Sequence, residues 1–521
     1  MSFRPHPPPS PLLFGYDPCR ELPDDHLVRL VEFVVEECVP AQAKGRGRGN
    51  PEYDPRLLLK LLLYSYAVGQ RSSRQIVRLC RESLPFLFLT RGRSVPSHTT
   101  LCEFRRQQAE LLEQVWVHLF QVAQELGVRR LGHLVVDSSK LRANASPEAV
   151  VEASEFEVLR QEFQALLAEA EARDEQEAEE GTPETRTGQS TCQEQVREIL
   201  RRVRRAQAQR RRGKKPRQEA PPPLGPQMKP RLREGLAALE AAQEQGAKHL
   251  CLTDPDSRMM PEGRERKVRQ CHSFEVAVDR EAGLLVVAQS SQSAQDNSRL
   301  EGLVEAAKAQ EPEGVKAVDG DSGYYQGAAV GRLLEQGIDV CVPDSQLAAD
   351  LHRGLPLGTH RQQHRSSVPL VYEEAEDQYR CPQGKVLPFR SERQEAAGKV
   401  RIYKTRESCE GCPLAPECLT RGHGRHRQAE RRQYEESLEA QRQRFEGEEY
   451  QERYRHRGEW VERVFGFLRA NLGYTRWLLR GKEGVACESR LFSLAYQLRK
   501  LYGTWRRSRN RPARLSLSAT G

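Results

Sequence analysis

Three acidic residues stand where their carboxylates could hold metal ions. Asp137 closes the apolar run 134–136, Asp321 closes the segment VKAVDGD, and Glu462 lies on a late amphipathic helix. Carboxylates that meet repel one another unless a cation joins them, and Mg²⁺ prefers a few carboxylate oxygens with water and phosphate. Two such ions, roughly 4 Å apart, can activate an attacking oxygen and stabilise a leaving oxygen at a phosphodiester. The spacing alone also fits three unrelated surface acids, which is the usual place of such residues.

Four cysteines have the spacing of a structural zinc site. Cys381 precedes a C-x₂-C-x₅-C run formed by Cys409, Cys412 and Cys418. Four thiolates satisfy tetrahedral Zn²⁺ in a closed site, and a loop-rich segment with little core gains most from one. The alternative is four reduced cysteines without a ligand. The other nine of the 13 cysteines are scattered singly, which is typical of small buried residues in a reducing compartment.

The composition excludes several classes of protein. With 521 residues, 37% hydrophobic and 30% charged, the chain allows about two to four domains separated by solvated helices or linkers. Its most apolar run, 57–68, is interrupted by Lys60 and is far short of the roughly 20 residues that span a bilayer, so we expect no membrane segment. The proline-rich start is unlike a signal peptide, which predicts a cytoplasmic protein. The sequence contains no phosphate-binding loop of the Walker type, so nothing in it indicates the use of ATP.

Helical segments fill the N-terminal region of the chain, about residues 20–128. Apolar residues recur there at helical spacing, and Ser72 or Ser73, and Ser97, stand where helix N-caps are expected. Three short helices with Arg105 and Arg106 on the last could form a helix-turn-helix reader of DNA. An ordinary helical bundle with solvated arginines is the competing interpretation.

Strands and helices alternate in the centre of the chain. A short strand at 134–136 is followed, after a long insertion, by a hairpin over FEVAVD and LLVVAQSS, and then by alternating helices and strands up to IDVCVPD. This order predicts a mixed α/β sheet. The insertion is helical, first acidic and then basic between Arg197 and Arg217, and contains the helix-breaking segment APPPLGP. Its basic block suits a solvated face or a phosphate backbone.

Three motifs in order resemble the DDE transposases of bacterial insertion sequences. They are VVDSSKLRANAS, DSGYY and VERVFGFLRANLGYTRW. The N-terminal segments LLFGYDP, YDPRLLLKLLLYSYAVGQRSSRQIVRLC and PSHTTLCEFRR, and the central DPDSRMM, are similar to the same group. The resemblance covers nearly the whole chain outside the insertion and the C-terminal tail.

The resemblance implies a ribonuclease H-like α/β catalytic domain, with a mixed sheet flanked by helices. The catalytic and metal-binding acids would be Asp137, Asp321 and Glu462, with Asp319 in reserve and Glu459 less favoured. Two Mg²⁺ or Mn²⁺ ions would be the cofactors. The DNA-binding candidates are Arg105, Arg106, Arg469, Tyr474 and Arg476.

The domain boundaries follow from these patterns together. The expected segments are an all-α N-terminal domain for terminal-repeat DNA (1–128), the first catalytic strand (129–147), the charged helical insertion with its linker (148–250), the catalytic core with the second Asp (251–345), the cysteine-rich insertion (346–430), the C-terminal helices with the Glu (431–503) and a basic disordered tail (504–521).

The implied function is cleavage of DNA at terminal inverted repeats and joining of the ends to target DNA. Double-stranded DNA would be the partner, a homodimer would pair two ends, and the protein would associate with the bacterial nucleoid. Two alternatives stay open: a ribonuclease H-like metal nuclease without strand transfer, and a catalytically inactive DNA-binding descendant.

Overall fold

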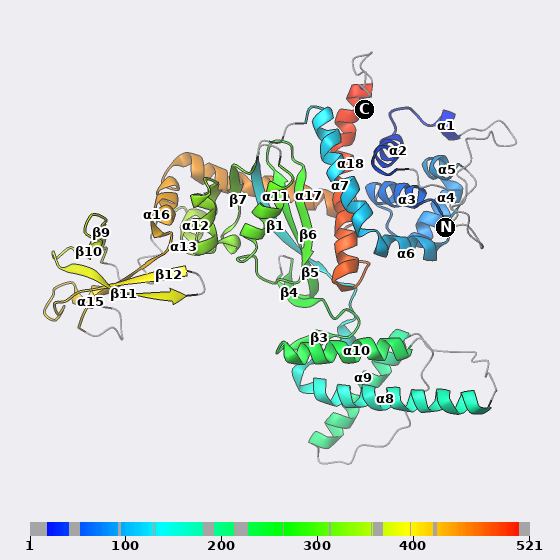
Figure 1. The fold of residues 1–521 in the computed structure, drawn as a ribbon, viewed down its shortest axis with the longest axis horizontal. Coiled ribbons are helices and arrows are strands. Elements are labelled where there is room, and N and C mark those ends of the chain that lie inside the picture. The colour runs from blue at the N-terminus through cyan, green and yellow to red at the C-terminus, as the bar shows by residue number, and fades with distance from the viewer. Residues whose placement is uncertain are drawn as a thin grey trace.

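The structure is a computed structural model that places a central sheet between three other parts (Figure 1). A helical N-terminal domain lies on one side, a helical insertion lies below, and a small separate sheet lies at the opposite end. The structure describes residues 18–40, 53–91, 95–128, 130, 132–180, 192–212, 228–263, 265–311, 314–355, 357, 368–395, 398–419 and 425–509. The N-terminal LLFGYD (12–17), the linker APPPLGP and the basic residues Lys214, Lys215 and Arg217 lie outside these ranges.

The N-terminal domain is helical, as the apolar spacing predicts. Ser72 and Ser97 cap the N-termini of two helices, and the Oγ of Ser97 accepts the N–H of Thr100 at 3.1 Å. Lys60, which interrupts the most apolar run, is buried, and its ammonium pairs with Glu36. The helices are α1 (Pro18–Glu21), α2 (Leu27–Cys38), α3 (Pro55–Ala67), α4 (Ser73–Glu82), α5 (Leu84–Thr90), α6 (His98–Gln107) and α7 (Ala109–Glu125).

The central sheet has the strand order β6–β5–β1–β7–β8, with β4 beside β6 on the outer edge of β5. β1, β7 and β8 run parallel, whereas β5 runs antiparallel to β1 and pairs with β6 as a hairpin. The strands are β1 (His133–Arg142), β4 (Arg258–Glu262), β5 (Lys267–Asp279), β6 (Leu285–Ser291), β7 (Ala317–Asp319) and β8 (Asp339–Cys341).

β1 does not end at Asp137, where the sequence pattern places its end. The strand continues to Arg142 because β5 is long enough to pair with it as far as Cys271. The serines and the lysine after Asp137 therefore belong to the strand, although they lack the apolar pattern by which a strand is recognised.

Helices cover both faces of this sheet. Leu134 and Val136 of β1 join an apolar cluster with α11 (Leu300–Lys308) and α12 (Gly327–Glu335), whereas Val135 and Leu141 join a cluster with α17 and α18. Side chains alternate between the two faces of a strand, so Asp137 lies on the α17 side. The other helices around the core are α13 (Ser345–Arg353), α16 (Glu435–Arg444), α17 (Glu448–Ala470) and α18 (Gly481–Arg509).

α18 joins the core to the N-terminal domain, since it packs on α3 and α7 as well as on β6 (Figure 1). The helix continues to Arg509, past the point where the disordered tail is expected to begin. Among the described helices, none is long and apolar enough to cross a membrane.

The insertion leaves and rejoins the core through a two-stranded ribbon. Its own apolar core lies between its helices, and three arginines of its basic block pair with acids of the same insertion. The ion pairs are Arg197–Glu148 (3.0 Å), Arg202–Glu162 (3.3 Å) and Arg204–Glu155 (2.9 Å). The elements are β2 (Val150–Glu152), α8 (Ala153–Glu180), α9 (Cys192–Arg211), α10 (Met228–Glu244) and β3 (His249–Cys251).

The cysteine-rich segment is a five-stranded antiparallel sheet rather than the loop-rich region that its sequence suggests. Its core is small, around Tyr379, Leu387 and Tyr403, and most of β11 is exposed, so no period-two apolar pattern reveals the strands. The elements are β9 (Val371–Glu373), β10 (Gln378–Arg380), β11 (Val386–Glu395), β12 (Gly398–Lys404), α15 (Ala415–Cys418) and β13 (Gln428–Arg432).

Candidate active site

Asp137 lies on β1, and Asp321 follows the neighbouring strand β7 by two residues. β1 and β7 are parallel and pair Val135 with Asp319, so two more residues along each chain bring Asp137 level with Asp321. The pKa of Asp137 is raised to about 7, chiefly by burial and also by the negative charges of Asp321 and Asp296. A hydrogen bond from the N–H of Ser138 at 2.7 Å and the positive charge of Arg457 oppose this rise only in part.

The two aspartates of the second acidic motif have different surroundings. Asp321 is partly exposed and caps a short 3₁₀ turn, where it accepts the N–H of Gly323 at 2.9 Å. Asp319 is buried, and its carboxylate accepts Nε of Arg453 at 2.6 Å and contacts Nε2 of His133 at 2.8 Å. Asp319 therefore belongs to a buried ion-pair network, and Asp321 is the acid that faces Asp137.

Asp296 is a nearby acid that the sequence analysis missed. Its Oδ1 accepts the hydroxyl of Ser138 at 2.9 Å and the ammonium of Lys140 at 2.7 Å, and its charge acts on Asp137. Lys140 also donates to Ser273 on β5. Asp296 lies in the loop between β6 and α11, so the strand-end rule used for the other aspartates could have found it.

α17 lies across β1 and carries the predicted glutamate. Arg469 donates to the hydroxyl of Ser139 at 2.6 Å, and Glu462 lies seven residues earlier, which places it on the same flank of the helix. Glu462 is exposed, and among the described residues it forms no hydrogen bond or ion pair. Glu459 is also exposed and pairs with His456 at 2.6 Å.

The donor set fits a hard divalent cation in part. Asp137 and Asp321 offer carboxylate oxygens whose mutual repulsion a cation would remove. Within the described ranges, however, no three His, Cys, Asp or Glu side chains lie close enough together to hold a metal ion as they stand. The structure brings the two aspartates together and leaves Glu462 apart from them.

Two family models match the chain. Residues 380–502 match a transposase DDE domain, and residues 18–107 match a transposase domain (DUF772). The two matches support an insertion-sequence DDE transposase. The first match covers Glu462 and Arg469, and neither match covers Asp137 or Asp321. No curated protein matches the chain.

Two of the predicted DNA-binding residues are buried. Arg105 is 6% exposed, and its Nη1 donates to the carbonyl of Arg71 at 2.9 Å and to the hydroxyl of Tyr66 at 3.2 Å. Tyr474 is 1% exposed and stacks on Phe492 with 3.5 Å between ring centroids. Both belong to the interior, so neither is available to DNA in this structure. The exposed candidates are Arg106, Arg469 and Arg476.

The four cysteines of the predicted zinc site gather at one end of the small sheet. Cys381 begins the turn from β10 to β11, Cys409 and Cys412 follow β12, and Cys418 ends α15. Both turns contain a glycine with positive φ, Gly384 and Gly411. The ammonium of Lys385 donates to the carbonyl of Ser408 at 2.5 Å and ties the two turns together. The four thiols are not assembled as a metal site in this structure.

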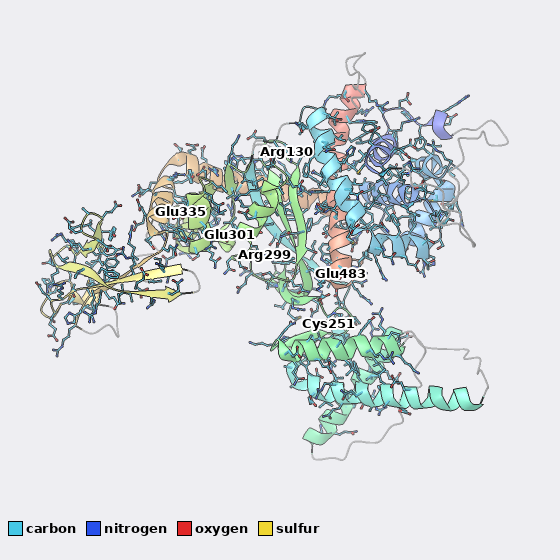
Figure 2. All side chains as sticks on the ribbon, in the orientation of Figure 1. Arg130, Cys251, Arg299, Glu301, Glu335 and Glu483 are labelled. Atoms are coloured by element: carbon cyan, nitrogen blue, oxygen red, sulfur yellow. The ribbon has the colours of Figure 1, made fainter. Side chains whose placement is uncertain are left out.

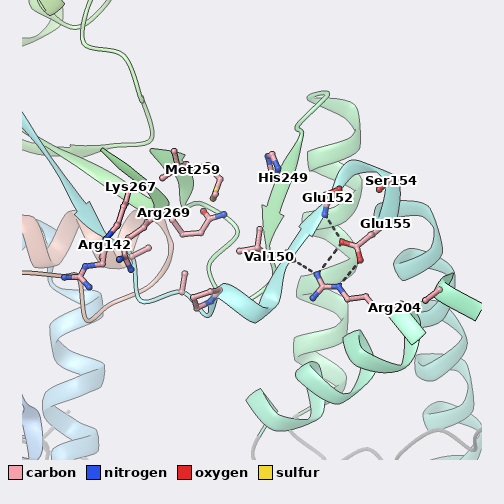
Figure 3. Close-up of a pocket in the computed structure, with 16 residues that line it drawn as sticks. Arg142, Val150, Glu152, Ser154, Glu155, Arg204, His249, Met259, Lys267 and Arg269 are labelled. Carbon is pink, nitrogen blue, oxygen red and sulfur yellow. Dashed lines mark hydrogen bonds and ion pairs between the residues drawn. The ribbon is translucent and has the colours of Figure 1, made fainter. Parts of the chain in front are cut away.

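A cleft of about 970 Å³ separates the core from the insertion (Figure 3). Arg142 and Lys267 line it from the core strands, and Arg204 lines it from the insertion. The two arginines already have acidic partners. Arg142 pairs with Glu262 at 2.9 Å. Arg204 pairs with Glu155, and dashed lines in Figure 3 mark this pair. The cleft offers little unpaired positive charge for an anion.

Proposed function

We propose that this transposase cuts DNA at the terminal inverted repeats of an insertion sequence and joins the released ends to target DNA. The observation that carries the proposal is the charge interaction between Asp137 on β1 and Asp321 just after the parallel neighbouring strand β7, on the sheet face that α17 covers. The sheet contains β1, a hairpin that pairs with it through the antiparallel strand β5, and two strands parallel to it. This arrangement is also that of a ribonuclease H-like domain, which supports the proposal of such a fold.

The proposed chemistry is two successive displacements at phosphorus. In the first, the oxygen of water bonds to phosphorus at the element's end, the P–O3′ bond breaks, and a 3′-hydroxyl and a 5′-phosphate are released. In the second, that 3′-hydroxyl attacks a phosphodiester of the target and displaces the target's own 3′-oxygen. Each step exchanges one phosphoester bond, so no external energy source is needed.

Asp137, Asp321 and Glu462 would hold two Mg²⁺ or Mn²⁺ ions. Such ions, when bound, supply Lewis-acid activation of the attacking and leaving oxygens. The protein positions the acids through the pairing of β1 with β7 and the packing of α17 across β1. Arg469, fixed by Ser139, is placed to contact a phosphate beside the acids.

DNA contacts would extend beyond the acids. The N-terminal helices, through Arg106, would recognise the terminal repeats, and Arg476 would add a phosphate contact near α18. Two element ends must be held together for joining, so the active complex would be at least a homodimer acting at the bacterial nucleoid.

The small sheet would carry a structural Zn²⁺. Cys381, Cys409, Cys412 and Cys418 come to one end of it on two tied turns, and thiolates with this C-x₂-C spacing suit a closed tetrahedral site. Purified protein should contain one zinc per chain, and Cys409→Ser should lose it, whereas Cys38→Ser, at a cysteine of the N-terminal domain, should keep it. Protein without stoichiometric zinc would contradict this assignment.

The test of function uses purified protein and labelled duplexes carrying the DNA that flanks the coding region. Wild type is compared with Asp137→Ala, Asp321→Ala and Glu462→Ala in Mg²⁺ and in Mn²⁺, and Glu459→Ala on the same helix is the matched control. Nicked and joined products that the three variants lose and the control keeps are expected. Nicking that never leads to joining would favour the nuclease, and binding without products in either metal would favour the inactive descendant.

A further inference from the structure

Three arginines from separate parts of the chain meet in one cleft. The cleft, of about 680 Å³, is lined by Arg106 of α6, Arg231 of α10 and Arg480 of the loop before α18. We call it the three-arginine cleft. It lies where the N-terminal domain, the insertion and the core come together, and Figure 2 labels Glu483, a residue of its rim, just above Cys251 of the insertion.

Much of the positive charge in this cleft is uncompensated. Arg106 is exposed and, among the described residues, its guanidinium has no hydrogen-bond or ion-pair partner. Arg480 is partly buried and uses its Nε to donate to the carbonyl of Asn144 at 2.7 Å. Burial lowers the pKa of Arg480, and the charges of Arg231 and Arg106 lower it as well, whereas the negative charge of Asp254 opposes the shift. The positive charges of Arg231 and Arg106 therefore act on Arg480.

The acids of the cleft do not cancel this charge. Glu234 pairs with Arg231 at 2.8 Å. Asp256 accepts the backbone N–H of Lys482 at 2.8 Å and the side-chain amide of Gln292 at 2.9 Å, which fixes it at the start of α18. Glu483 is exposed at the rim. Arg106 and Arg480 line the cleft, and among the described residues neither forms an ion pair with a carboxylate, although the charge of Asp254 acts on Arg480.

We propose that the three-arginine cleft binds the phosphate backbone of DNA. Guanidinium groups match phosphate oxygens with two parallel hydrogen bonds, and like charges held together gain most when an anion joins them. The cleft between core and insertion in Figure 3 has similar residues, but its arginines are paired with glutamates. Because its walls come from three parts of the protein, a bound phosphate would fix the insertion and the N-terminal domain against the core.

The position of the cleft sets its distance from the acids. Asn144, on its wall, follows Asp137 by seven residues along β1 and its extension. Seven extended residues span at most about 23 Å, which is roughly seven base pairs along one DNA strand. If the proposed cleavage holds, the phosphate bound here lies within about seven base pairs of the cut. Only this spacing rests on the proposed function.

The test is the salt dependence of DNA binding by the full chain. A labelled duplex of arbitrary sequence is titrated without added divalent ions between about 50 and 200 mM salt. Loss of one phosphate contact reduces the slope of log K against log salt by about 0.9 and lowers affinity about eightfold at 0.1 M salt. We expect this result for Arg106→Ala and for Arg480→Ala.

The matched control is Arg233→Ala, which removes an exposed arginine of α10 that pairs with Glu171 outside the cleft. Its slope should equal that of wild type. Arg106→Ala removes an exposed side chain without a polar partner among the described residues, and an unchanged thermal unfolding curve should accompany its reduced slope. Unchanged slopes in both cleft variants, or slopes reduced as much in the control, would overturn the inference. A reduced slope in a protein that never cuts DNA would support the cleft and contradict only the proposed function.

Discussion

Replacing Asp319 and Asp321 separately should have opposite effects on stability and on cleavage. Asp321 is partly exposed and faces Asp137, so Asp321→Ala should abolish cleavage and leave stability nearly unchanged. Asp319 is 1% exposed and holds Arg453, whose side chain is 10% exposed. Asp319→Ala should therefore destabilise the core, and the fraction that stays folded should still cut DNA.

The size of the loss follows from the ion-pair network. Removing one member of a buried pair costs about 3–5 kcal/mol, because the other charge is left without its partner. Arg453 keeps Asp339 as a second partner, which places the expected loss near the lower end, about 3 kcal/mol. For a domain of the core's size, this corresponds to a fall in Tm of about 6–12 °C.

The assay pairs thermal unfolding, followed by circular dichroism, with cleavage measured at a temperature where each variant is folded. The reasoning is refuted if Asp319→Ala unfolds like wild type and loses cleavage, while Asp321→Ala cuts normally. In that event Asp319 is the second acid of the site, and the network with Arg453 is dispensable for folding.

Two further outcomes concern packing and pH. A Cβ on Gly331 of α12 would collide with the side chain of Tyr434, so Gly331→Ala should lower the free energy of unfolding by about 1–3 kcal/mol in chemical denaturation. The control is Gly302→Ala on α11, where a Cβ meets open space, and this variant should be as stable as wild type or more stable. Equal stability of the two variants would contradict the close contact with Tyr434. Burial favours a higher pKa for Glu36, but the hydrogen bond and charge of Lys60 outweigh burial and lower that pKa. The Glu36–Lys60 pair therefore stabilises the fold above the ordinary glutamate pKa, and this stabilisation is lost as the pH falls through the pKa of Glu36 in the folded protein. The stability of Glu36→Gln should vary less over that pH range, and an acid unfolding profile identical to that of wild type would contradict a stabilising role for the pair.

The order of elements in the core is readable from the sequence because it depends on local pattern. Apolar runs such as 285–288 and helical spacing around 300–308 give the hairpin, helices and strands from 273 to 341 at nearly their observed positions. The continuation of β1 beyond Asp137 was not readable, since its polar residues are strand only because β5 pairs with them.

Site residues were predictable by type but not always by exposure. Arg105 and Arg106 are adjacent, and nothing local tells which one faces inward; Tyr66, from another helix, decides it. Tyr474 looks like a surface aromatic among basic residues, but Phe492 of α18 covers it. Such outcomes depend on contacts between distant segments, which the spacing of residues does not encode.

The ribbon of β2 and β3 has a consequence for the order of folding. Val150 pairs with Cys251, so the chain leaves the core and returns to it at almost the same point. β1 and β5, which carry Asp137 and its partner Val276, are far apart in sequence, and closing so long a loop slows folding. Once the insertion has formed its own core and ribbon, the remaining loop between the two strands is short. We therefore expect the insertion to fold early and to lower the entropic barrier to pairing β1 with β5.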